Sequence, residues 1–232
     1  MAVITVSREL GSNGKAIAAQ VAEELGYVCF DKTLILELSR QAEVSELEVS
    51  RYDEKLVNPI RQWLKEMIVQ PWDTLVNPPV SMSFADAAGL SLLIPDEENA
   101  LDSAAYHEFL ERLLIRLWRR DNVVIVGRGA QRVLAGRTRT LHVRIVASEE
   151  LRSDRIMKRE NLDRNDSMTL IRRTDNARAK YFSRRYHMDW ADPTLYNMTI
   201  NTGMTREEET CRIICDATRR MIASARHHEE ES

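Results

Sequence analysis

The stretch that decides the fold is Met1 to Ala18, which reads MAVITVSRELGSNGKAIA. Residues 2–6 are apolar and rich in β-branched side chains, which predicts a buried strand. Gly11, Gly14 and Lys15 follow, and apolar residues at helical spacing then continue along the chain. Glycines let backbone N–H groups converge on one anion, while a helix N-terminus and a lysine add positive charge. A strand, a glycine turn, a lysine and a helix, in that order, therefore predict a cradle for phosphate groups.

The turn fits the phosphate-loop pattern G-x-x-x-x-G-K-[ST] only in part. Gly14 and Lys15 match it, whereas Glu9 stands at the leading glycine and Ala16 at the hydroxyl residue that normally ligates magnesium. On spacing alone, an ordinary strand-to-helix turn with a surface lysine remains an alternative. The rest of the chain has to decide between the two.

Composition limits the classes of protein to consider. The chain has 232 residues, of which 44% are hydrophobic, so it can form one large α/β domain or a core with an insertion. A net charge of −3 argues against a protein that binds bulk nucleic acid. Three cysteines are too few for a disulfide framework, and Cys211 and Cys215 share a helix face, which favours packing over metal binding. The N-terminal run is too short for a signal peptide and no window is long enough to span a membrane, so we expect a cytoplasmic protein.

Strand-like and helix-like segments alternate along the chain. This alternation predicts a parallel sheet with helices on both faces. The expected strands are 2–6, 27–30, 122–126, 141–146 and 196–200, and the expected helices include 15–25, 32–41, 45–56, 59–70, 103–120 and 205–224, with a frayed polar tail from residue 226. Five prolines within residues 59–95 indicate an insertion, which would form either a mobile cap over a substrate or a dimer surface.

Two polar residues follow predicted strands, where ligands of open α/β folds bind. Asp31 is one, although capping of the next helix would also explain it. Arg128, between Gly127 and Gly129, is the other, and it suits bidentate contact with a phosphate or a carboxylate. His142, within a strand, is interpreted as a structural residue.

Residues 152–185 carry the strongest charge signal, with eleven basic side chains against five acidic ones. Nine of the basic residues are arginines, which favours phosphate recognition. Two basic helices joined near residues 161–166 would form a lid over a triphosphate, in which Asp175 could hold Arg178 three residues later. The alternative is a solvated helix pair crossed by salt bridges.

Taken together, several pieces resemble the cytidylate kinase-like family, a bacterial branch of the P-loop nucleoside monophosphate kinases. They lie in the same order as in that family and span nearly the whole chain. The matching pieces are Ile4-Thr5-Val6-Ser7-Arg8, Gly11-Ser12-Asn13-Gly14, VIVGRGA at 124–130, LHVRIVAS at 141–148 with Leu151-Arg152, Thr174-Asp175 with Arg178 and Tyr181, and YNMTINTG at 196–203.

The resemblance implies a three-layer α/β/α kinase fold with a parallel sheet. Its core would comprise residues 1–45, 103–150 and 190–225, its acceptor-binding helical insertion residues 46–102, and its arginine-rich lid residues 151–189. It also implies transfer of the γ-phosphoryl group of ATP, with Mg²⁺, to CMP or dCMP, and leaves a homodimer possible.

The resemblance further assigns roles to individual residues. The implied ATP phosphate cradle is Gly11, Ser12, Asn13, Gly14 and Lys15, and the implied adenine-side residues are Asn201, Thr202 and Gly203. The implied acceptor contacts are Ser7, Arg8, Asp31, Arg128, Asp175 and Arg178. The implied catalytic cations are Lys15, Arg155, Arg159 and Arg178, and no metal ligand is identified.

Two departures from the family pattern bear on function. Ala16 removes the usual magnesium hydroxyl, so Ser12, water or the nucleotide phosphates would have to hold the ion. Cytidylate kinases proper carry an aspartate after the Gly-Arg pair, where this chain has Gly129. A kinase of another small metabolite is therefore an alternative. Another is a nucleotide-binding sensor or interaction protein without turnover, which Ala16 and Glu9 favour.

Overall fold

The computed structural model describes residues 2–31 and 104–230. The chain forms two compact units, one of residues 1–32 with 113–232 and the other of residues 33–112. The helices expected at 32–41, 45–56 and 59–70 and the insertion expected at 46–102 lie outside the described residues. The architecture below is that of the first unit.

The first unit is built on a five-stranded sheet in which every described strand pairing is parallel. The strand order is β2-β3-β1-β4-β5, so the N-terminal strand lies at the centre. Parallel strands bring their carboxyl ends to one edge, and the phosphate-loop turn and Gly127-Arg128 both follow strands there. The strands are β1 (Val3–Arg8), β2 (Val28–Phe30), β3 (Val123–Val126), β4 (Thr140–Val146) and β5 (Met198–Asn201).

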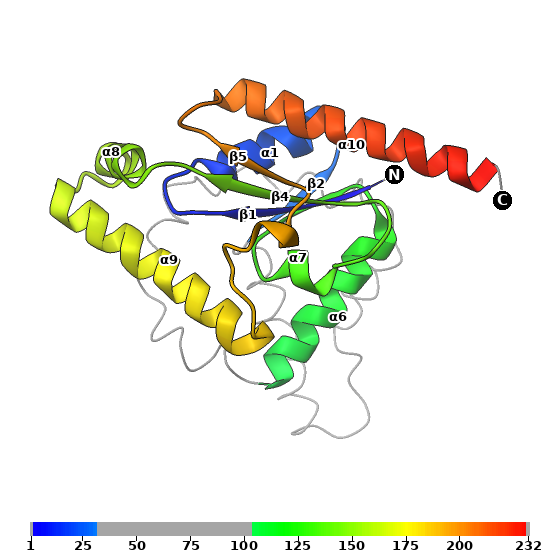
Figure 1. Cartoon of the computed structure of the whole chain (residues 1–232), viewed down its shortest axis with the longest axis horizontal. Coiled ribbons are helices and arrows are strands. Elements are labelled where there is room, and N and C mark those ends of the chain that lie inside the picture. Colours follow the sequence, from blue (N-terminus) through cyan, green and yellow to red (C-terminus); the bar gives the residue numbers. More distant parts are fainter. Residues whose placement is uncertain (1, 32–103, 231–232) are drawn as a thin grey trace, which may run out of the picture. The chain divides into compact units, whose positions relative to one another are not determined.

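Helices alternate with these strands, as the sequence predicts (Figure 1). Helix α10 packs beside α1, and α8 packs beside α9. The helices are α1 (Gly14–Leu25), α6 (Ala104–Arg120), α7 (Ala130–Val133), α8 (Glu149–Glu160), α9 (Arg164–Tyr186) and α10 (Glu207–Glu230), with a 3₁₀ turn η2 at Pro193–Leu195.

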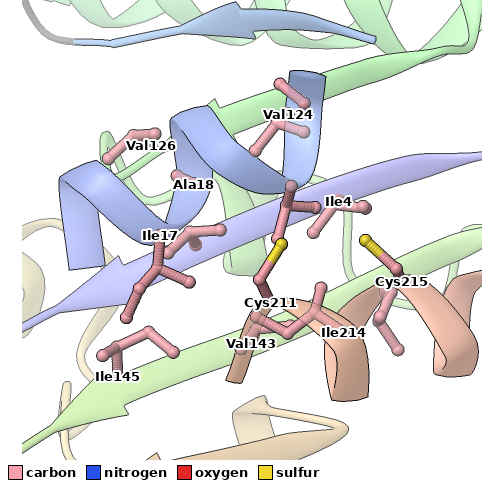
Figure 2. Packing of buried hydrophobic residues seen from close by; sticks show 14 of the residues in the cluster. Ile4, Ile17, Ala18, Val124, Val126, Val143, Ile145, Cys211, Ile214 and Cys215 are labelled. Carbon is pink, nitrogen blue, oxygen red and sulfur yellow. The ribbon is translucent and has the colours of Figure 1, made fainter. Parts of the chain in front are cut away.

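One face of the sheet forms a hydrophobic core cluster with α1 and α10 (Figure 2). Ile4 of β1 is fully buried there, and it pairs with Val124 on one side and with Leu141 on the other. Ile17 of α1 and Ile214 of α10 complete the layer and are also fully buried. Val3 and Thr5, which alternate with Ile4 along β1, are buried as well. The strand is therefore covered on both faces, which explains its nearly continuous apolar sequence.

The ends of several elements differ from the prediction. Strand β1 continues to Arg8 because Ser7 and Arg8 pair with β4 despite their polarity. Strand β5 begins at Met198 and ends at Asn201, and helix α10 runs on to Glu230 instead of ending at 224. The short helix α7 was not expected, and it begins after Gly129, whose positive φ of 68° redirects the chain.

The three cysteines are free thiols. Cys211 and Cys215 lie in the core cluster shown in Figure 2, which agrees with the packing role predicted for them. Burial raises the pKa of the Cys215 thiol to about 12 and that of the Cys29 thiol to about 11. His142 also has the structural role expected, since its Nδ1 lies 2.7 Å from Thr5 Oγ1. None of the helices in the described ranges has the length and apolarity that a membrane crossing requires.

Candidate active site at the carboxyl edge of the sheet

The loop between β1 and α1 is a tight turn with two close backbone approaches. Gly11 has a φ of 82°, and a Cβ atom there would lie 2.9 Å from the carbonyl oxygen of Arg152. A Cβ atom on Gly14 would lie 2.6 Å from Cβ of Arg8. Asn13 also has a positive φ, of 60°. These values agree with the predicted need for glycine in a turn that leads backbone N–H groups into the start of α1.

Lys15, in the first turn of α1, forms an ion pair with Asp31 at the end of β2. The distance from Lys15 Nζ to Asp31 Oδ2 is 2.8 Å, and the lysine side chain is 62% exposed. Both residues were predicted to serve the site, but their pairing was not foreseen. An exposed ammonium group of this kind can exchange its carboxylate partner for a phosphate group.

Arg8 and Arg128 lie together beside Gly127, at the ends of β1 and β3. A Cβ atom on Gly127 would lie 2.5 Å from Arg8 Nη1, so a side chain there would displace this guanidinium group. The pKa of Arg8 is lowered to about 10, first by burial and then by the positive charges of Arg178 and Arg128. Among the described residues, no hydrogen bond reaches the buried Nε and Nη2 atoms of Arg128. Buried guanidinium donors that lack a partner mark this cluster as a candidate anion site.

Asp175 of α9 joins helices α8 and α9 to the loop. Its Oδ1 accepts hydrogen bonds from the backbone N–H of Leu10 at 3.0 Å and from Arg178 Nη1 at 3.0 Å. Its Oδ2 accepts a third from Arg152 Nη1 at 2.6 Å. The expected Asp175–Arg178 pair is therefore present. Burial lowers the pKa of Arg178, whereas Asp175 raises it.

Arg155 connects α8 to the turn that follows β5. Its Nη1 donates to the hydroxyl of Thr202 at 2.9 Å and to the carbonyl of Gly11 at 3.3 Å, and its Nη2 donates to the carbonyl of Thr202 at 3.0 Å. The hydroxyl of Thr202 in turn donates to the carbonyl of Ser12 at 3.0 Å. Thr202 thus lies directly beside the phosphate loop.

The other predicted residues of the loop and of this turn make local hydrogen bonds. The amide Nδ2 of Asn13 donates to Glu207 Oε1 at 2.5 Å, which ties the loop to the start of α10. The N–H of Gly203 donates to Asn201 Oδ1 at 2.9 Å.

Three further predicted residues make contacts within the protein. The hydroxyl of Ser7 is buried and accepts hydrogen bonds from Trp190 Nε1 and the Tyr196 hydroxyl, which is a structural role. The hydroxyl of Ser12 is also buried and donates to the carbonyl of Glu9 at 2.9 Å. Arg159 is 55% exposed and pairs with its neighbour Glu160.

The two interpretations of the arginine-rich stretch each describe part of it. Arg164 and Arg172 form exposed ion pairs with acids of α8, as a solvated helix pair would. Arg152, Arg155 and Arg178 instead reach backbone groups of the loop and its flanking strand. The helix faces with these three arginines are therefore the ones relevant to a ligand.

Sequence reasoning missed a second polar cluster behind the loop. The carboxylate of Glu9 lies 3.6 Å from Arg144 Nη2 and 3.5 Å from Arg152 Nε. The guanidinium of Arg144 lies 4.2 Å from the ring centroid of Trp190 and donates to the carbonyl of that residue. Only Glu9 gave a signal in the sequence, because it replaces a motif glycine, and nothing identified its partners.

The described residues fit anionic groups better than they fit a metal ion on its own. Three arginines and a lysine lie around the loop, and the buried atoms of Arg128 call for an acceptor. No group of three or more His, Cys, Asp or Glu side chains with the geometry of a metal site occurs in the described part of the chain. The arrangement can therefore hold two anionic groups, one at the loop and one at the Arg8–Arg128 cluster.

Solved structures with the same fold support this description of the scaffold. A crystal structure of an uncharacterized protein from Eubacterium ventriosum aligns with a TM-score of 0.61 and 16% identity, over 94% of this chain and 98% of that one. A gluconokinase from Sinorhizobium meliloti aligns with a TM-score of 0.50 and 12% identity, over 98% of this chain and 97% of that one. At these identities the likeness concerns the fold alone, a three-layer α/β/α kinase fold.

Sequence comparisons also find relatives and a matching family model. A cytidylate kinase from Methanopyrus kandleri is 29% identical over 101 residues, which cover 40% of this chain and 52% of the relative. A cytidylate kinase from Methanocaldococcus jannaschii is 28% identical over 112 residues, which cover 47% of this chain and 63% of the relative. The matches thus span between half and two thirds of these relatives. The model of the cytidylate kinase-like family matches residues 3–204, a range that contains the loop, both arginine clusters and the Thr202 turn. This chain therefore belongs to the cytidylate kinase-like family.

Proposed function

We propose that this protein transfers the γ-phosphoryl group of ATP to a pyrimidine nucleoside monophosphate, CMP or dCMP. The observation that carries the proposal is the arginine cluster at the ends of β1 and β3. Arg8 and Arg128 are close enough to lower the pKa of Arg8, and Arg128 has buried donor atoms with no described partner. A monophosphate of the acceptor would supply the oxygen atoms that these donors lack.

The charges of the site support two phosphate positions. The two carboxylates that raise the pKa of Arg8, those of Asp31 and Asp175, already pair with Lys15 and with Arg178, respectively. Positive charge therefore remains at Arg8 and Arg128 for an incoming anion. A neutral sugar acceptor would leave that charge unmatched, so the geometry favours a phosphorylated acceptor over an unphosphorylated one.

The loop and its neighbours would bind ATP. The backbone of residues 11–14 and the side chain of Lys15 would hold the β- and γ-phosphates, and the Thr202 turn would lie near the adenine. Arg178, between the loop and the acceptor cluster, would stabilise the charge on the transferring group. Arg155 would fix the loop against the Thr202 turn, with no contact to the phosphates needed for that role.

Magnesium would be held mainly by phosphate oxygens and water. Ala16 has no side-chain oxygen, and the Ser12 side chain is fully buried. The described carboxylate beside Lys15 is that of Asp31, which fits the preference of Mg²⁺ for one or two carboxylates together with substrate phosphates. When bound, the ion would neutralise charge that develops on the phosphates.

The test is an acceptor panel assayed by ADP release with purified protein. The panel contains CMP, dCMP, UMP, AMP, cytidine and gluconate, so that nucleotide class, phosphate requirement and sugar-acid acceptors are separated. We expect turnover with CMP or dCMP and none with cytidine. Turnover with cytidine or gluconate alone would reject a phosphorylated acceptor. Calorimetric binding of ATP without ADP release for any acceptor would reject phosphotransfer and support the sensor alternative.

A further inference from the structure

Glu9 is the residue that most clearly departs from a standard phosphate loop, and its surroundings explain why. Its backbone N–H donates to the carbonyl of Ile145 at 3.1 Å, which continues the pairing of β1 with β4 by one residue. Its side chain then reaches the backbone N–H of Ala147, which donates to Glu9 Oε2 at 3.3 Å. Glu9 therefore fastens the first residue of the loop to the end of β4.

The carboxylate of Glu9 belongs to a group of four charged side chains, which we call the charge quartet: Glu9, Arg144, Arg152 and Asp175. Arg144 and Arg152 are both buried, with exposed fractions of 5% and 8%. Glu9 lies between the two guanidinium groups, and Asp175 pairs with Arg152 at 2.6 Å. The quartet is electrically neutral, with two acids and two bases. Buried arginines without counter-charges are strongly destabilising, so Glu9 stabilises the buried Arg144 and shares Arg152 with Asp175.

The quartet also holds the backbone of Leu10. The N–H of Leu10 donates to Asp175 Oδ1 at 3.0 Å, and its carbonyl accepts from Arg152 Nη1 at 3.1 Å. Both polar groups of this peptide segment are thus bound by side chains of α8 and α9. The next residue, Gly11, packs so closely against Arg152 that a side chain would clash with its carbonyl oxygen.

We propose that Glu9 is a positioning residue for phosphoryl transfer. Through Arg152 and Asp175 it sets the loop conformation at Leu10 and Gly11, and it thereby fixes where Arg178 lies relative to the loop. Glu9 touches neither substrate in this scheme. The inference rests on the proposed phosphotransfer function, and it reverses the meaning of the substitution: the missing motif glycine is part of a working site and not a sign of lost turnover.

The variants that test this role are Glu9→Gln, which keeps the size of the side chain and removes its charge, and Glu9→Gly, which restores the motif glycine. Glu24→Gln is the matched control, because Glu24 is 60% exposed and pairs only at the surface, with Arg219. The measurements are kcat, the KM for ATP and for the acceptor, and hydrogen exchange at the Leu10 amide by NMR.

We expect Glu9→Gln to lower kcat about tenfold or more while the KM for ATP changes by less than about threefold, because misplacement of Arg178 affects the transition state more than the binding of ATP. Exchange at the Leu10 amide should become about tenfold faster, since its acceptor Asp175 would be drawn toward the unbalanced Arg152. Glu9→Gly should lose more activity than Glu9→Gln, although it restores the motif. Glu24→Gln should match the wild type in every measurement.

Wild-type or higher turnover of Glu9→Gly would overturn the proposal, as would a Glu9→Gln variant that behaves like Glu24→Gln in both kcat and amide exchange. If Glu9→Gln does not fold, Glu9→Asp replaces it. The aspartate keeps the charge but is shorter, so it should show the same fall in kcat and rise in exchange to a smaller degree, and wild-type values would overturn the proposal. Should the wild type itself turn over no acceptor, the proposed function fails, whereas the Leu10 exchange still tests the role of Glu9 in the loop.

Discussion

Replacement of Arg128 by methionine should make the protein more stable and a worse enzyme at the same time. Methionine has a side chain of similar length but lacks the guanidinium group. The buried Nε and Nη2 atoms of that group have no hydrogen-bond partner among the described residues. It also removes one of the two positive charges that lower the pKa of Arg8. Arg128 therefore destabilises the ligand-free fold, and its guanidinium group becomes stabilising only when an anion accepts hydrogen bonds from it.

The size of both effects follows from the same two donor atoms. A buried unsatisfied donor lowers the free energy of unfolding by about 1–3 kcal/mol. Because the Arg128 side chain is partly exposed, removal of both atoms should raise that free energy by about 1–2 kcal/mol. In a protein of this size that gain raises Tm by about 2–8 °C. Hydrogen bonds to a charged group are worth about 1.5–3 kcal/mol, so loss of the contact with the acceptor phosphate should raise the acceptor KM by about 10- to 150-fold.

The assay combines thermal unfolding of the free protein with steady-state kinetics in CMP and ATP. Arg132→Met is the control, because Arg132 lies exposed on α7, and it should leave both Tm and KM unchanged. A fall in Tm for Arg128→Met, or a loss of ATP affinity with an unchanged acceptor KM, would refute the reasoning. The first result would make Arg128 an ordinary packing residue, and the second would move it to the donor side of the site.

Three further predictions concern the loop and the sheet. Lys15→Ala should lower kcat about 100-fold, as measured by steady-state kinetics. It should lower the free energy of unfolding by less than about 1 kcal/mol, as measured by urea unfolding, because the lysine of its ion pair with Asp31 is exposed. Gly11→Ala should cost more than about 2 kcal/mol of unfolding free energy, because a Cβ atom would strike Arg152, whereas Gly136→Ala, with a similar positive φ and open space, should cost only about 1 kcal/mol. Burial lowers the pKa of His142, so its contribution to stability is present above the unfolded pKa near 6.5 and is lost as pH falls below it. Between pH 7.5 and 5, the free energy of unfolding of His142→Gln should therefore change less steeply with pH than that of the wild type, by at most about 1.4 kcal/mol per pH unit. Equal slopes for the two proteins would contradict this.

Much of the fold could be predicted because its strands are apolar runs bounded by turn residues. The central strand and the strand that begins near residue 122 are of this kind, and the glycines of the loop mark the turn directly. The predicted ends of strands were less accurate where a strand is extended by pairing with its neighbour and not by apolar residues. Ser7 and Arg8 are polar, yet they continue β1 because Arg144 and Ile145 of β4 lie opposite them.

Individual contacts within the site could be predicted from residue spacing only where neighbours in sequence are neighbours in space. Asp175 and Arg178 are three residues apart on one helix, and the structure confirms their contact. Glu9 and Arg144 are far apart in sequence and meet because β1 and β4 pair side by side. No pattern in one sequence specifies such a contact, so the partners of Glu9 and the buried role of Ser7 became apparent only in the structure.

The buried thiols have a practical consequence for experiments on this protein. Thiolate is the reactive form of cysteine, and the raised pKa values of Cys29, Cys211 and Cys215 keep all three protonated near neutral pH. Alkylating dyes should therefore react slowly with the native cysteines. Met204 is 86% exposed and follows the Thr202 turn. A single Met204→Cys change should then accept one fluorophore there, where its emission would report nucleotide arrival in real time.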